Sequence, residues 1–172
     1  MTVLEQIKTN NISELHLSQD ADEITERTSE IVDALRSNTS IATVRFEGEF
    51  LGAMRNDSRR EVVQVIGMIP TLQRVHLGDT LLVVSGIAKM LCKATGLCEL
   101  SISNMVMQGI ESDFSILEAT LASHKSLKIF KMDKCRPAVQ GISLDGLTRS
   151  STTLLTNNFA DIVPITPTSQ AA

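Results

Sequence analysis

The sequence predicts an α/β fold, a solenoid with a parallel sheet on its concave face and helices on its convex face. Three observations lead to this expectation. A six-residue pattern, apolar-x-x-apolar-x-apolar, recurs at intervals of 25 to 31 residues. A segment with helical periodicity lies inside each long interval. The chain of 172 residues is 42% hydrophobic but only 3% aromatic, so its core must be aliphatic.

The repeated pattern is expected to form the strands. Alternating apolar residues suit a strand with one buried face, and recurrence at similar spacing makes the signal specific. The five clear copies begin at Ile12, Ile41, Leu72, Leu97 and Leu127. A sixth copy, Val139-x-x-Ile142-x-Leu144, begins only 12 residues after the fifth and leaves no room for a helix. We therefore expect residues 138–146 to close the sheet as a last strand.

The first helices follow from apolar spacing. Leu4 and Ile7 fit the last turn of an N-terminal helical cap. A helix is expected over residues 23–36, where three apolar residues share one face: Ile24, Ile31 and Leu35. Stacked strand–helix units of this kind build a continuous core, which no single unit can form alone.

The later helices carry further signals. Ser58 and Glu61 fit a capping box that opens a helix ending before Pro70. Ser115 and Glu118 fit a second capping box. Between them, three apolar residues repeat at helical spacing: Val84, Ile87 and Leu91.

The repeat is clearest in four segments, ALRSNTSIATVRF, PTLQRVHL, TGLCELSI and KSLKIFKM. These segments resemble the ribonuclease-inhibitor-like class of leucine-rich repeats, and the resemblance spans roughly residues 4–146. It implies a short leucine-rich-repeat solenoid of about five to six strand–helix units. The family's usual Asn or Cys, three positions beyond the pattern, is present only as Cys135. The segments NNISELHLS and EIVDALRSNTSIATVRF show a weaker resemblance to tropomodulin-type actin-capping proteins.

The chain is expected to have two parts. Residues 1–146 form the repeat array with its N-terminal helical cap, and residues 147–172 form a Ser/Thr-rich C-terminal tail. Two interpretations of the tail stay open. It is extended or disordered, or its apolar residues dock on the end of the array. Those residues are Leu154, Leu155, Phe159, Ile162 and Val163.

Composition excludes several classes of partner. The net charge of −4 gives no bulk attraction to nucleic acid or to an anionic membrane. Without Trp or Tyr, the chain lacks the aromatic residues on which single-stranded nucleic acid stacks. No secretory signal and no apolar run long enough to span a membrane is visible. Three cysteines without a Cys-x-x-Cys pair also favour a reduced compartment, so we expect an intracellular, cytoplasmic protein.

Candidate binding residues lie on the predicted concave face. We expect the second, third and fifth positions of each pattern to point inward. Seven charged residues or histidines at these positions are the candidates: His16, Arg45, Arg74, His76, Glu99, Lys128 and Lys131. They form a mildly basic strip beside an acidic rim that includes Glu47 and Asp133. Such a strip suits a protein partner with an acidic segment, although a solvated sheet face needs polar residues in any case.

No catalytic arrangement emerges from the sequence. Known nucleotide-binding, metalloprotease and nucleophile-elbow motifs are missing. His16 and His76 stand two strands apart, about 10 Å at the usual strand spacing, which is too far for shared metal ligation. His124 is expected in an exposed turn and Cys92 in a buried helix face. We therefore expect no cofactor, no metal and no small-molecule substrate.

The sequence thus predicts a non-enzymatic protein–protein interaction module or assembly subunit that presents a rigid concave sheet. The alternative is a regulator of an enzyme or filament, either a GTPase activator or an actin-end binder, as the resemblance implies. A GTPase activator would need an exposed arginine near the nucleotide, and Arg45 and Arg74 are the candidates.

Overall fold

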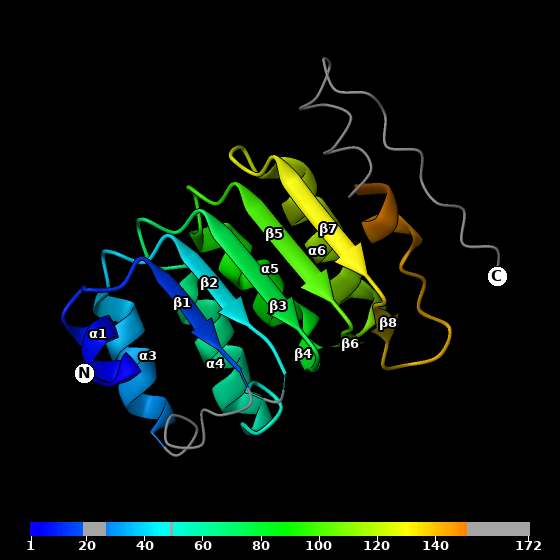
Figure 1. Cartoon of the computed structure of the whole chain (residues 1–172). Helices are drawn as coiled ribbons and strands as arrows, with labels where there is room; N and C mark the ends of the chain where they lie inside the picture. Colours follow the sequence, from blue (N-terminus) through cyan, green and yellow to red (C-terminus); the bar gives the residue numbers. More distant parts are fainter. Residues whose placement is uncertain (19–26, 49, 151–172) are drawn as a thin grey trace.

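The structure, a computed structural model, describes residues 1–18, 27–48 and 50–150 (Figure 1). Strands and helices alternate along the chain and form two layers, with the main sheet on one side and a row of helices on the other (Figure 1). This confirms the predicted α/β solenoid. None of the helices in the described part of the chain has the length and apolar character that a membrane crossing requires.

Five parallel strands form the main sheet within the described residues, in the order β1-β2-β3-β5-β7. Their bounds are β1 (Glu14–Leu17), β2 (Thr43–Phe46), β3 (Arg74–Gly78), β5 (Glu99–Ser103) and β7 (Ile129–Asp133). Equivalent positions of successive repeats pair across the sheet, as in the row Leu15, Val44, Val75, Leu100 and Phe130. The apolar pattern therefore predicts the register correctly.

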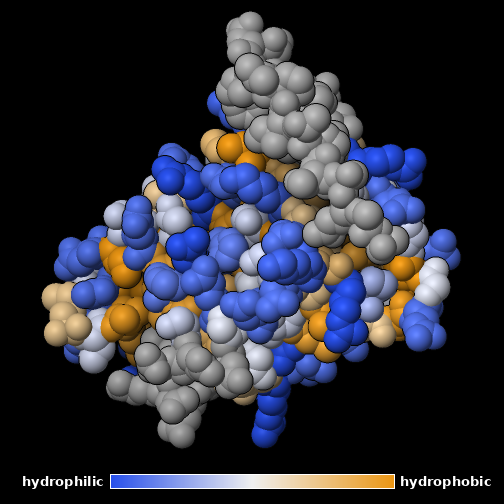
Figure 2. All heavy atoms as spheres, turned by 45° about the vertical axis from the view of Figure 1, so that its right-hand side comes forward, coloured by the Kyte–Doolittle hydropathy of each residue, from blue (hydrophilic) through white to orange (hydrophobic). Residues whose placement is uncertain are grey.

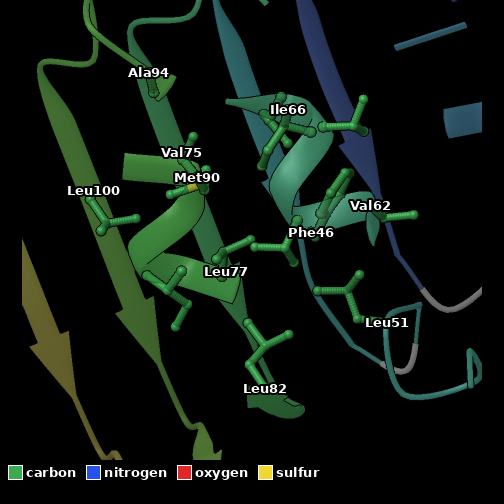
Figure 3. Packing of buried hydrophobic residues seen from close by; sticks show 14 of the residues in the cluster. Phe46, Leu51, Val62, Ile66, Val75, Leu77, Leu82, Met90, Ala94 and Leu100 are labelled. Atoms are coloured by element: carbon green, nitrogen blue, oxygen red, sulfur yellow. The ribbon is translucent and has the colours of Figure 1, made fainter. Parts of the chain in front are cut away.

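The helices pack side by side in chain order. They are α1 (Val3–Lys8), α3 (Thr28–Ser37), α4 (Asn56–Ile66), α5 (Val84–Lys93) and α6 (Glu111–Ser123). The short helix α1 is the predicted N-terminal cap, since Leu4 and Ile7 are both buried against the core. Apolar side chains from the sheet and the helices, most of them aliphatic but Phe46 among them, fill the space between the two layers (Figure 3). Cys92 is exposed rather than buried, because it lies on the outer side of α5.

Two helices begin earlier than their predicted capping boxes. Helix α4 starts at Asn56, so Ser58 lies inside its first turn and caps nothing. Helix α6 starts at Glu111, and the carboxylate of Asp113 accepts a hydrogen bond from the amide of Ile110 at 3.0 Å. The hydroxyl of Ser115 instead donates to the carbonyl of Glu111. A serine followed by a glutamate fits the interior of a helix as well as its start, and the preceding loop decides which occurs.

A second, smaller sheet was not predicted. It consists of β4 (Leu81–Val83), β6 (Val106–Gln108) and β8 (Arg136–Pro137), all parallel. Each of these strands follows a main strand after a sharp turn. The turns contain a residue with positive φ at the same repeat position: Gly48 at 61°, Asp79 at 58°, Asn104 at 50° and Lys134 at 51°. This turn redirects the chain after β2, β3, β5 and β7, and after the last three of these strands it leads into the small sheet.

The expected closing strand is not formed. Residues 138–144 contain no strand, and residues 145–150 are helical. Gly141 has a φ of 89°, in the left-handed region, which interrupts an extended backbone there. Ile142 and Leu144 still pack against the core, and Leu147 is fully buried. Ile142 and Leu144 of the sixth pattern thus cover the end of the array without extending the sheet, whereas Val139 is exposed. The boundary at residue 146 stays a prediction, and the five apolar tail residues lie outside the described residues.

Candidate binding site on the concave face

The concave surface of the main sheet holds a hollow of about 510 Å³. Six of the seven predicted site residues line it: His16, Arg45, Arg74, His76, Glu99 and Lys131. Lys128 is not among the described residues that line the hollow, because it precedes β7 by one residue. Lys128 is exposed, and its part in the binding site stays a prediction. In the space-filling view, hydrophilic side chains predominate across the middle of the visible face (Figure 2).

The side chain of Glu47 joins three of the predicted residues. Its Oε2 lies 3.0 Å from Nε2 of His16, and its Oε1 lies 3.1 Å from Nε of Arg45. The same Oε1 lies 3.2 Å from Nε2 of His76. Glu47 directly follows β2, between the strands that carry the two histidines. Its carboxylate therefore folds over the sheet and does not stand apart as an acidic rim.

The two histidines have different surroundings. The side chain of His16 is 55% exposed, whereas that of His76 is 23% exposed and has Oγ of Ser103 3.4 Å from its Nε2. Burial lowers the pKa of His76 below its ordinary value, and the negative charge of Glu47 partly offsets this effect. The pairing of both rings with one carboxylate was missed from the sequence, although Glu47 stands directly after the second pattern.

The remaining charges of the face are nearly balanced. Lys131 pairs with Glu99, with 3.2 Å between Nζ and Oε1. Arg74 lies beside Glu99 in the sheet but forms no ion pair with any residue that the structure describes. Arg45 and Lys131 of the expected basic strip are therefore neutralised by carboxylates on the same face, whereas Arg74 is left available to a ligand.

The other candidate side chains have structural roles. His124 is half-buried rather than exposed: its Nε2 donates to the carbonyl of Ala94 at 2.9 Å, and its Nδ1 accepts from the amide of Leu127 at 3.1 Å. Burial raises the pKa of the Cys135 thiol, which contacts the carbonyl of Ile102 in the preceding repeat. Among the described residues, no group of three His, Cys, Asp or Glu side chains is placed to hold a metal ion.

Comparison with known proteins identifies the fold. No family model matches the sequence, and no curated protein matches it. A solved structure of actin-binding site 2 of leiomodin-1 is 18% identical, with a TM-score of 0.65 over 91% of this chain and 87% of that one. The C-terminal domain of tropomodulin from Caenorhabditis elegans is 13% identical, with a TM-score of 0.66 over 91% of each chain. These likenesses show a shared fold and favour the tropomodulin-type resemblance over the ribonuclease-inhibitor-like class.

Proposed function

We propose that this chain is a non-enzymatic protein-binding module and that its ligand is actin. One observation carries the proposal: the fold matches, over 91% of this chain, a domain whose description is an actin-binding site. The match covers 87% of that domain, so it is not confined to one or two repeats. The proposal favours the actin-end binder among the functions considered from the sequence, within the broader class of interaction modules.

The concave face supplies a suitable surface for this binding. The backbone hydrogen bonds of a parallel sheet hold its side chains in a rigid array, so little conformational entropy is lost when a partner docks. Arg74 offers a planar guanidinium that can bind a carboxylate through two hydrogen bonds. Lys131 and Arg45 are about half exposed and can exchange their present carboxylates for those of a partner.

Co-sedimentation with actin filaments and a pyrene-actin assembly assay test the proposal. We expect the purified chain to bind filaments or to slow subunit exchange at their ends. The double variant Arg45→Glu and Arg74→Glu should bind at least tenfold more weakly, because two cations of the concave face become anions. Higher salt should also weaken the parent complex.

A matched control changes the same amount of charge on the convex face. Lys89 and Lys93 are exposed on α5, and the double variant Lys89→Glu and Lys93→Glu should bind actin like the parent. If only this control variant loses binding, the docking surface lies on the helices and not on the concave face. No effect of the parent chain on actin in either assay would overturn the proposed ligand.

A further inference from the structure

Among Glu47 and the residues that line the hollow, carboxylates and permanent cations are equal in number. The carboxylates are Glu14, Glu47 and Glu99, and the cations are Arg45, Arg74 and Lys131. Two imidazoles, His16 and His76, stand among them. When both imidazoles are neutral these charges cancel, and when both are protonated the face gains two positive charges. The net charge of this set therefore depends on whether the two histidines are protonated.

Glu47 cannot neutralise both imidazoles once they are protonated. Its Oε1 is already shared between Arg45 and His76, and its Oε2 contacts His16. Glu47 alone would then face three cations, so it cannot neutralise both protonated rings.

Other charged groups around the two rings modify this balance without removing it. Glu99 faces His76 from β5, and Lys131 extends from β7 to pair with Glu99. Asp79 faces His76 from the end of β3, but its carboxylate accepts hydrogen bonds from the amide of Gly48 at 3.1 Å and from Nδ2 of Asn104 at 2.9 Å. Asp79 is therefore occupied and is not free to turn toward a protonated imidazole.

We propose that the concave face binds an acidic segment of a partner protein and that protonation of His16 and His76 strengthens this binding. The partner's carboxylates take up the positive charge that Glu47 leaves unpaired. The proposal deepens the proposed function, because it assigns a ligand chemistry and a pH dependence to the same face.

The geometry of the strands indicates how such a segment lies. His16, Arg45 and His76 are at the same level of three adjacent strands, and Lys131 is at that level two strands further on. Neighbouring strands lie roughly 4.8 Å apart, so these side chains form a row across the sheet. An extended acidic segment that crosses the strands can place successive carboxylates along this row.

A fluorescent peptide of ten aspartates is the probe, because its carboxylates stay ionised throughout the range from pH 5.8 to pH 7.5. Binding is measured by fluorescence anisotropy at both pH values, with circular dichroism to confirm the fold. We expect the parent chain to bind at least fivefold more tightly at pH 5.8. The double variant His16→Gln and His76→Gln retains His124. Its affinity for the peptide should differ by less than twofold between the two pH values.

A second variant tests the effect of the Glu47 charge without changing the two histidines. Glu47→Gln removes the balancing carboxylate, so it should bind the peptide more tightly than the parent already at pH 7.5. Side-chain NMR should show that the pKa of His76 falls in this variant, because the charge of Glu47 favours the protonated ring. Binding that is independent of pH in the parent, or equally dependent on pH in the double histidine variant, overturns the proposal. An absence of peptide binding at pH 5.8 overturns it as well.

A failure of the histidine effect can be distinguished from a failure of the proposed actin binding. If the chain binds no actin at either pH but binds the peptide at pH 5.8, actin is the wrong ligand and the histidine effect stands. If it binds actin with an affinity that the histidine variant leaves unchanged, and binds no peptide, the protein-binding function stands and the histidine effect is wrong.

Discussion

The carboxylate of Asp79 accepts a hydrogen bond from the backbone amide of Gly48, which stands 31 residues earlier in the chain, at a distance of 3.1 Å. The other oxygen of Asp79 accepts from Nδ2 of Asn104, in the following repeat, at 2.9 Å. All three residues have positive φ and occupy the same turn of successive repeats. The turn thus links neighbouring repeats through side chains as well as through the strands.

Lys134 occupies this turn in the last repeat, with a φ of 51°. A lysine in the left-handed region costs about 1 kcal/mol relative to residues that adopt it readily, such as Gly and Asn. Lys134→Asn should therefore raise the free energy of unfolding by about 0.5–1 kcal/mol, measured by urea denaturation. Lys125→Asn, at an exposed position without positive φ, is the control and should change it by less than about 0.5 kcal/mol. Equal effects of the two changes would contradict this account.

Gly96 interrupts a series of hydroxyl contacts between repeats. Ser40 donates to the carbonyl of Ile12 at 2.7 Å, and Thr71 donates to the carbonyl of Ile41 at 2.8 Å. A Cβ placed on Gly96 would lie 3.6 Å from the equivalent carbonyl, that of Leu72, which is an ordinary contact. Gly96→Ser should therefore complete the series and stabilise the fold by about 0.5–1.5 kcal/mol. Gly96→Ala measures the backbone effect alone, and a serine variant no more stable than the alanine variant would refute the added hydrogen bond.

Gly67 follows α4, where the chain passes close to α5. A Cβ at this position would lie 2.5 Å from the carbonyl oxygen of Met90, which belongs to the helix backbone and cannot rotate away. Gly67→Ala should therefore lower the free energy of unfolding by about 1–3 kcal/mol, since α4 and α5 must separate. Thermal and urea denaturation measure the loss. The same change at Gly96, where there is space, should not destabilise the protein in this way.

The stability of the protein should also depend on His76. Its pKa in the folded state lies below the ordinary value because burial disfavours the charged ring. The unfolded chain therefore binds this proton more readily, so stability is full above the ordinary histidine pKa and falls as the pH drops through it. The free energy of unfolding should decrease between pH 7.5 and pH 5.5 by less in His76→Gln than in the parent. A parallel decrease in both proteins would show that His76 does not contribute.

The sequence by itself determined the repeat and the register of its strands. The apolar residues of each pattern alternate with a period of two, and a slip of one residue would expose every one of them. Leu15, Val44, Val75, Leu100 and Phe130 therefore lie in one row, as their spacing predicts. The N-terminal cap and the order of helices also follow from local apolar spacing.

The tertiary structure alone decided the details of the turns and of the site. The first residues of α4 and α6 depend on the conformation of the preceding loop. A serine near a glutamate does not determine where the helix begins. The contacts of Glu47 with His16 and His76 arise because three repeats stack and the turn after β2 folds its side chain back over the sheet. Such contacts join residues about 30 positions apart, so their geometry depends on how the repeats pack, and no local pattern in the chain encodes it.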